Sequence, residues 1–284
     1  GNQAANEETV VDATTTLRML FEEHFERGLE MNPLRATSIG DYRFNDRLAN
    51  SNSPEYRAAA IAMDEDFLQR LLEIDRGALN YQDQLSYDLF RVRREQSLEG
   101  YQFPSHLQPI NQFSAITSSF VQLGSGTSVH PFKMVKDYDD FLSRADDFAV
   151  IVEQLITNMK EGMRQGVTQP RILVEKLLPQ INSQIVDDPK ASRFYAPVSE
   201  LPEDFSTEDR ERLIAAYEDK ISNTIIPAYR SISSFIGDEY LGAARETVGL
   251  YAQPNGEAWY AYMVRLRTTT DLTPDEIHQI GLDE

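Results

Sequence analysis

The chain has 284 residues, of which 41% are hydrophobic and 10% aromatic, and this is enough to build one large core or two modest ones. Its formal net charge of −19, from 46 acidic and 27 basic residues, repels nucleic acid and anionic lipid head groups, so no nucleic acid partner is expected. Cysteine is absent, which excludes disulfides and thiolate zinc sites.

The first sixteen residues are small, polar and acidic, and we expect residues 1–16 to form a flexible tether. Gly1 in place of Met indicates that a signal peptide has been removed. A mature lipoprotein, held to the bacterial envelope by a lipid anchor and facing the periplasm, would carry such a tether. Residues 17–284 are expected to form one helical domain.

The first helix is predicted from an apolar stripe that includes Leu17, Leu20 and His24. It should end near Gly28, and residues 31–44 should follow as a connection marked by Pro and Gly.

Two further helices precede the middle of the chain. Ser53 and Pro54 predict the start of one, because a hydroxyl cap followed by Pro is typical of a helix N-terminus. The other covers residues 79–100 and ends at Gly100. One side of it is expected to carry Leu85, Leu89, Val92 and Arg93.

Residues 101–131 lack helical periodicity and are rich in Ser, Gly and Pro. An irregular stretch of this length inside a compact domain is typical of a functional segment or of one that covers a cleft. A short helix around Phe113–Leu123 is the alternative interpretation.

Helical spacing resumes at Lys136 and should end at Gly162 or Gly166. Another helix should begin with Pro170 in its first turn, and a loop is predicted over residues 197–205. The long helix that follows, over residues 206–241, should be kinked or interrupted by the Pro at position 227.

The last part of the chain is predicted to contain a short strand at 248–252, a turn at 254–256 and a helix that includes Trp259. A final helix should begin with a capping box between Thr273 and Glu276. The fold class is therefore all-α, with at most one short β-hairpin.

The four histidines, His24, His106, His130 and His278, are far apart in sequence and form no paired zinc motif. His24 lies on an apolar stripe and is expected to be a buried core residue bonded to a neighbour. Pro131 holds His130 extended in a loop. His130 is interpreted either as a residue that lines a cleft or as a loop residue without a functional role. His278 and Asp275 share a helix face, either as an ordinary surface pair or as an oriented histidine. No catalytic residue and no metal ligand is assigned to this chain.

The C-terminal sequence QPNGEAWYAYMVRLRTTTDLTPDEIHQIGLDE resembles a motif of the bacterial domain-of-unknown-function family 885, whose members include metallopeptidase-like lipoproteins. The stretches NPLRATSIGDYRFNDRL and 137–181 are also similar to that family, so the resemblance covers nearly all of the chain after the tether. Asn255 and Trp259 depart from the family pattern, which has Gly and Tyr there. The matching residues are Pro254, Gly256, Tyr260, Thr268, Thr269, Leu272, Thr273, Pro274, Glu276, Ile277, His278, Gly281 and Leu282.

The resemblance implies a helical fold similar to the thimet oligopeptidase and angiotensin-converting-enzyme type of zinc metallopeptidase. The family's candidate zinc motif, His-Glu-Ala-x-Pro-Gly-His-His, does not occur here, so the resemblance implies a chain truncated before its catalytic half. Zn²⁺ would belong to the intact protein. Tyr260, Thr269 and His278 are then candidate residues for binding a peptide substrate.

Two functions follow from these observations. The chain is either the N-terminal half of an envelope zinc peptidase, forming one wall of the substrate cleft, or a non-catalytic helical lipoprotein or binding module. The first predicts an exposed apolar surface that the missing C-terminal half once covered, with self-association or a poorly ordered last helix as its consequence. The residues expected on that surface are Trp259, Tyr262, Met263, Leu266, Ile277, Ile280 and Leu282.

Overall fold

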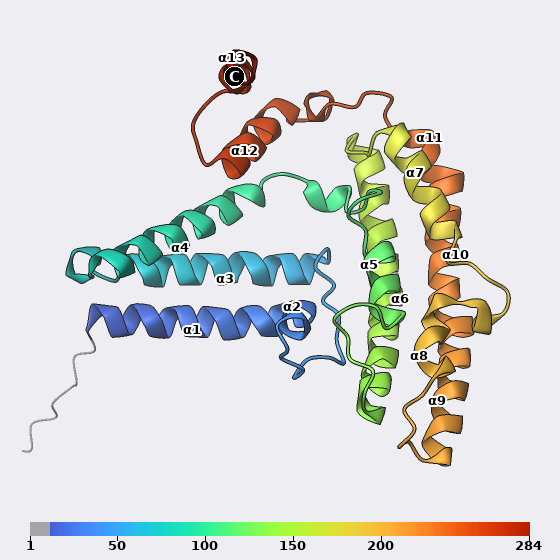
Figure 1. The fold of residues 1–284 in the computed structure, drawn as a ribbon. Coiled ribbons are helices and arrows are strands. Elements are labelled where there is room, and N and C mark those ends of the chain that lie inside the picture. The colour runs from blue at the N-terminus through green and yellow to red at the C-terminus, as the bar shows by residue number, and fades with distance from the viewer. Residues whose placement is uncertain (1–11) are drawn as a thin grey trace, which may run out of the picture. The chain divides into compact units, whose positions relative to one another are not determined.

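The computed structural model describes residues 12–284, and Figure 1 shows that part of the chain as a series of helices. Within it there is no strand, and an isolated bridge between Pro170 and Arg245 is the sole β-type pairing. The all-α prediction is confirmed. None of the described helices is long and apolar enough to cross a membrane.

The described chain divides into two compact units. The first unit contains residues 12–31 and 58–102, and the second contains residues 32–57 and 103–284. Of the predicted tether, residues 1–11 lie outside the described residues, and the first helix already begins at Ala13.

The first unit is built from three long helices. These are α1 (Ala13–Met31), α3 (Pro54–Leu72) and α4 (Tyr81–Gly100), with the short 3-10 helix η1 (Arg76–Ala78) before α4. α1 does not stop at Gly28 as predicted but continues to Met31, since Gly28 keeps helical backbone geometry and does not adopt the left-handed conformation of a glycine C-cap. α1 and α3 are antiparallel, since Arg70 pairs with Glu23 and Arg27 pairs with Asp66.

A small apolar core joins these three helices. Its buried residues are Leu17, Leu20, Met63, Phe67, Leu71, Ile74, Leu79 and Tyr87. The side of α4 that carries Leu85, Leu89 and Val92 is exposed, at 44%, 60% and 40%. α4 instead packs through Tyr87 and Phe90, whose rings fill the space beside α1 and α3.

His24 belongs to this core, as predicted from its apolar stripe. Its ring lies edge-on to Phe67 and Phe90, and its Nε2 is 2.5 Å from the Arg94 guanidinium. Arg94 also donates to the buried carboxylate of Asp64 at 2.7 Å. The side chain is therefore held by neighbours and has a structural role.

The second unit contains the remaining helices. In chain order they are α2 (Pro33–Ser38), η2 (Ser105–Leu107), α5 (Ile116–Gly124), α6 (Val135–Gln165), α7 (Arg171–Asn182), η3 (Pro189–Ala191), η4 (Arg193–Tyr195), α8 (Ala196–Ser199), α9 (Thr207–Lys220), η5 (Ile221–Ile225), α10 (Ile226–Phe235), η6 (Ile236–Tyr240), α11 (Leu241–Ala243), η7 (Leu250–Ala252), α12 (Gly256–Thr268) and α13 (Pro274–Asp283).

α6 is the central helix of this unit, and it runs parallel to the continuous helical run from α9 to α11 (Figure 1). Ion pairs join the two at successive levels, Asp139 with Arg212, Asp146 with Lys220 and Lys160 with Glu239. α6 ends at Gly166, whose φ of 74° suits a glycine. The interruption predicted at Pro227 is present as the π-helical turn η5 just before it, since Pro has no N–H to continue the α-helical ladder.

Three predicted irregular segments contain short helices instead. α2 lies in the predicted connection 31–44, α8 lies in the predicted loop 197–205, and η7 replaces the predicted strand at 248–252. Each is only three to six residues long. Elements of this length contain too few turns to show an apolar period, so sequence spacing does not reveal them.

A buried polar cluster fastens the segment 32–48 to α6. The Arg144 guanidinium is fully buried and donates to the Thr37 hydroxyl at 2.6 Å and to the Arg47 carbonyl at 3.1 Å. It also lies 2.8 Å from Nδ1 of His130, whose Nε2 is 2.8 Å from the Asp137 carbonyl. Because a carbonyl only accepts, Nε2 of His130 carries the proton and Nδ1 accepts from Arg144.

Candidate functional site

A groove of about 510 Å³ lies in the second unit between residues 109–122, the segment 49–52 and α6. We call it the serine groove. Its floor is apolar and its edges carry hydroxyl and amide groups from the segment 49–52, the loop before α5, and α5 itself. The residues that line it are Ala49, Ser51, Asn52, Pro109, Ile110, Phe113, Ser114, Ala115, Ile116, Ser118, Ser119, Gln122, Ile151 and Leu155.

Buried amides on two other elements hold the walls of the groove in place. Asn158 of α6, which is only 7% exposed, donates to the carbonyls of Asn52 at 2.9 Å and His106 at 3.1 Å. Gln169 donates to the carbonyl of Ile110 at 3.1 Å. The backbone of 52 and of 106–110 is thus fixed by side chains that would lose buried hydrogen bonds if it moved.

The turn before α5 places an aromatic ring at the groove. The Asn111 side chain accepts from the backbone N–H groups of Phe113 and Ser114 at 2.8 and 2.9 Å, which is an Asx turn. This turn leaves the Phe113 ring 90% exposed. An apolar ring held out in water by a fixed turn is typical of a ligand-contacting residue.

The serine groove is electrically neutral, although the chain carries a charge of −19. None of its lining side chains is ionisable. The hydroxyls of Ser51, Ser114 and Ser118 make no hydrogen bond within residues 12–284, so they can donate to or accept from a ligand. The lining residues include no imidazole and no carboxylate.

Sequence reasoning located the stretch 101–131 but none of the groove residues Ser51, Ser114 or Ser118. The short helix predicted as an alternative around 113–123 is confirmed as α5. The richness of this stretch in Ser was the available indication, but a hydroxyl's availability depends on neighbours that are distant in sequence.

The three predicted substrate-binding residues lie on the C-terminal elements of the same unit. Tyr260 is on α12, 36% exposed, with its ring 5.0 Å from that of Tyr251. Thr269 ends α12 in a left-handed conformation, φ 57°, and donates to the Thr268 carbonyl at 2.6 Å. His278 is exposed on α13. No hydrogen bond or ring contact joins these three residues within the described chain, and none joins His278 to Asp275.

α12 is packed against the start of the irregular stretch. Trp259 and Tyr262 are buried, and their rings stack on Phe103 at centroid distances of 6.1 and 5.1 Å. At the first residue of α12, a Cβ on Gly256 would lie 2.2 Å from the Leu250 carbonyl oxygen, so only glycine allows this close approach. Trp259 and Tyr262 therefore belong to a small apolar cluster with Phe103, whereas Tyr260 between them is exposed.

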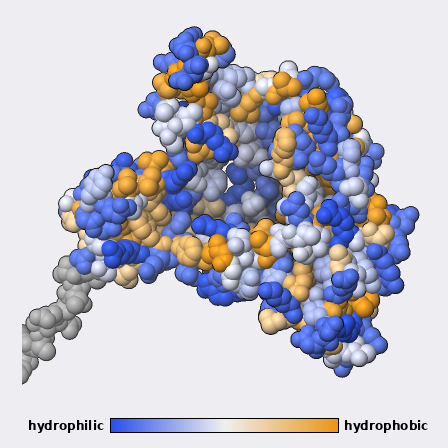
Figure 2. All heavy atoms as spheres, in the orientation of Figure 1, coloured by the Kyte–Doolittle hydropathy of each residue, from blue (hydrophilic) through white to orange (hydrophobic). Residues whose placement is uncertain are grey.

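α13 is held by its own capping box and buries no residue. Thr273 accepts from the Glu276 N–H at 3.2 Å, and Glu276 accepts from the Thr273 N–H at 2.7 Å. Ile280 and Leu282 are 49% and 65% exposed, and Figure 2 shows hydrophobic residues on the surface of this helix. The predicted exposed apolar surface is therefore present on α13. The prediction of exposure is wrong for Trp259 and Tyr262, because both side chains are buried against Phe103.

Within residues 12–284 no three His, Asp or Glu side chains converge as metal ligands. His130 is buried beside Arg144 and does not line a cleft. Burial lowers the pKa of its imidazole to about 4. Burial first, and then the charge of Arg57, lowers the pKa of His106, whose Nδ1 has no partner within the described chain.

Comparison with known proteins gives a family and solved structures that share the fold. A family model described as "Bacterial protein of unknown function (DUF885)" matches residues 33–284. A crystal structure described as "the putative lipoprotein from Colwellia psychrerythraea" superposes with a TM-score of 0.82 at 18% sequence identity, over 96% of this chain and 49% of that one. The chain thus spans about half the length of that neighbour, and at this identity the likeness shows the fold alone. No curated protein matches. The chain belongs to the bacterial DUF885 family of proteins of unknown function.

Proposed function

We propose that this chain is the N-terminal, substrate-binding half of a zinc-dependent peptidase of the bacterial envelope, with the serine groove as part of one wall of its cleft. The observation that carries the proposal is a preformed, uncharged groove with free hydroxyls in the stretch that sequence analysis predicted to be functional. The extent of the neighbour beyond the aligned half, and its description as a lipoprotein, support the larger protein and its place at the envelope.

The groove suits the main chain of a peptide. Peptide N–H and C=O groups need hydrogen-bonding partners when they leave water, and the serine hydroxyls and the Asn52 and Gln122 amides supply both kinds. The buried side chains of Ile110, Ile151 and Leu155 offer an apolar floor to a side chain of the ligand. We therefore propose that neutral peptide segments bind here in preference to charged ones.

The catalytic metal would be supplied outside the residues described here. In the fold type that the family resembles, Zn²⁺ activates water for attack on a peptide carbonyl. This chain contributes binding and orientation, with Tyr260, Thr269 and His278 proposed as further substrate contacts. The exposed apolar side chains of α13 are proposed to meet the C-terminal half, or a second copy in its absence.

The test is peptide binding by calorimetry. A blocked, uncharged tetrapeptide of alternating Ala and Leu should bind, and replacing both Leu by Glu should weaken binding by about tenfold or more, because a carboxylate entering an apolar groove leaves water without a counter-charge. Ser118→Asp should weaken binding of the neutral peptide similarly. Ser128→Asp, on an exposed loop outside the groove, is the matched control.

Equal binding of the charged and neutral peptides, or equal loss in the two serine variants, would remove the groove from the proposal. The alternative function, a non-catalytic lipoprotein or binding module, is favoured by the absence of any nucleophile with a base in the groove. It predicts the same peptide binding but no hydrolysis by the intact protein.

A further inference from the structure

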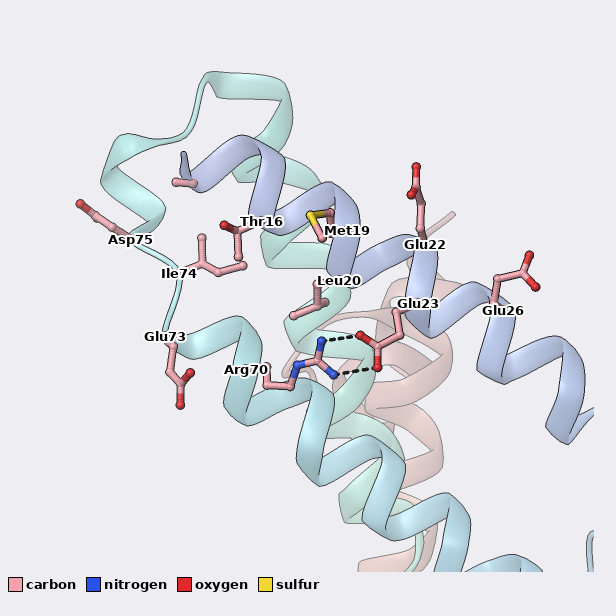
Figure 3. A pocket seen from close by; sticks show the side chains of 11 residues that line it. Thr16, Met19, Leu20, Glu22, Glu23, Glu26, Arg70, Glu73, Ile74 and Asp75 are labelled. Carbon is pink, nitrogen blue, oxygen red and sulfur yellow. Dashed lines mark hydrogen bonds and ion pairs between the residues drawn. The ribbon is translucent and has the colours of Figure 1, made fainter. Parts of the chain in front are cut away.

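The first unit carries a second groove, which the proposed function does not use. It has a volume of about 870 Å³ and lies between α1 and the segment 70–75 at the end of α3 (Figure 3). We call it the acidic groove. Its lining residues are Ala13, Thr16, Met19, Leu20, Glu22, Glu23, Glu26, Arg70, Glu73, Ile74 and Asp75.

The floor of this groove is apolar. Leu20 and Ile74 are part of the unit's core, at 3% and 7% exposure, and they close the groove from below. Met19 lies above them and is 61% exposed. Methionine is flexible and polarisable, so an exposed Met beside a concave apolar floor is suited to contact a partner's apolar side chains.

The edges of the groove carry negative charge. Glu22 and Glu26 extend from α1 on one side, and Glu73 and Asp75 extend from the segment that follows α3 on the other (Figure 3). The one basic side chain in the lining, Arg70, is already engaged by Glu23, with contacts of 2.5 and 3.0 Å. Beyond that pair, Glu22 and Glu73 place negative charge at opposite edges, and Asp75 adds to it while accepting from the Gly77 N–H at 2.9 Å.

The groove is elongated. Its lining positions on α1 run from Ala13 to Glu26 and recur every three or four residues along one face. Thirteen residues at a rise of about 1.5 Å each give a length of about 20 Å, so the shape matches a segment of chain rather than a compact small molecule. Residues 1–11 contain Glu7 and Glu8 and no Lys or Arg, so this chain's own N-terminal residues lack the complementary charge.

We propose that the acidic groove docks a cationic amphipathic helix of a partner protein, with its apolar residues on Met19, Leu20 and Ile74 and its Lys or Arg side chains on the carboxylates at both edges. Apolar contact supplies the affinity in this mode, and complementary charge supplies the orientation and the rate of association.

The experiment uses a labelled 14-residue helical peptide with Leu on one face and Lys on the other, and measures its binding to the chain by fluorescence anisotropy. Two comparison peptides keep the pattern, one with Glu replacing Lys and one with Ser replacing Leu. The Leu/Lys peptide should bind at least about tenfold more tightly than either, and raising NaCl from about 50 to 300 mM should weaken it several-fold.

Substitutions in the acidic groove then test whether the peptide binds there. Glu22→Lys with Glu73→Lys should weaken binding about tenfold, whereas Glu200→Lys with Glu203→Lys makes the same change of charge on the second unit and should alter it less than about twofold. Met19→Ser should weaken binding about threefold or more. Met134→Ser is its matched control, because Met134 is equally exposed at 61% and lies outside the groove.

Circular dichroism checks that each variant is folded. If the double charge reversal unfolds the first unit, Met19→Ser and its control still test the proposal. Three results would overturn the proposal: equal binding of the Leu/Glu peptide, equal binding of the Ser/Lys peptide, or equal effects of the groove variants and their controls.

Discussion

His130 makes the stability of the second unit depend on pH in a way that one substitution should remove. Its imidazole is 3% exposed, its Nε2–H donates to the Asp137 carbonyl at 2.8 Å, and its Nδ1 accepts from Arg144. Burial lowers its pKa from 6.5 to about 4. A proton added to Nδ1 would break the bond from Arg144 and place two buried cations side by side.

The sign and size of the effect follow from linkage. Above pH 6.5 the imidazole is neutral in both the folded and the unfolded chain, so the full stability is present. As the pH falls below 6.5 the unfolded chain binds a proton that the folded chain does not, and the free energy of unfolding falls. At about 1.4 kcal/mol per pH unit, the loss reaches about 3 kcal/mol by pH 4, where the folded chain also becomes protonated.

The assay is urea denaturation of the wild type and His130→Gln at several pH values between 4 and 7.5. Trp259 is the one tryptophan and is buried in the second unit, so its fluorescence reports on the unit that contains His130. Gln is neutral at every pH and can donate to the Asp137 carbonyl. The variant is expected to be less stable at pH 7.5, where an imperfect fit costs packing.

Between pH 7 and pH 4 the wild type should lose about 3 kcal/mol more than His130→Gln, because other titrating groups cancel in the difference. His106→Gln provides an internal comparison, since the pKa of His106 is also lowered but its side chain is only half-buried. Parallel curves for the wild type and His130→Gln, separated by a constant free energy, would refute the reasoning.

Other predictions concern backbone positions that the sequence marks. Gly256→Ala should destabilise the second unit by about 1–3 kcal/mol or more in the same fluorescence assay, because its Cβ would overlap the Leu250 carbonyl, whereas Gly281→Ala meets no atom within 4 Å and should be neutral or slightly stabilising. A fall in stability only for Gly281→Ala would contradict this. Thr273→Ala removes the cap of α13 and should cost that helix about 1 kcal/mol, seen as faster amide exchange over residues 276–284. Unchanged exchange there would show that the capping box does not hold α13.

The sequence predicted the long helices well because their apolar periods and caps are local. The start of α3 at Pro54, the end of α6 at Gly166 and the capping box of α13 are each encoded within a few residues. The buried face of α4 was not predictable in this way, because Leu85, Leu89 and Val92 form a helical stripe that is exposed. Burial is decided by the helices that pack on α4, and one sequence window does not contain them.

The candidate site was only partly predictable for the same reason. The stretch 101–131 was recognised from its missing periodicity, but the serine groove is completed by Ser51 and by Ile151 and Leu155 of α6, which are distant in sequence. The groove is uncharged, and the hydroxyls of Ser51, Ser114 and Ser118 make no hydrogen bond within the described chain. Both properties arise only when the chain is folded. Tyr260, Thr269 and His278 came from the family resemblance, and the fold places them on α12, its end and α13 without bringing them into contact.

The central claim is that this chain forms a substrate-binding wall of an envelope zinc peptidase. The most direct test is to purify the protein as its gene encodes it, without chelator, and to measure its zinc content together with cleavage of a blocked neutral peptide. The account predicts about one zinc per chain and cleavage whose KM rises about tenfold in Ser118→Asp but not in Ser128→Asp. A protein without stoichiometric metal that cleaves no peptide would contradict it.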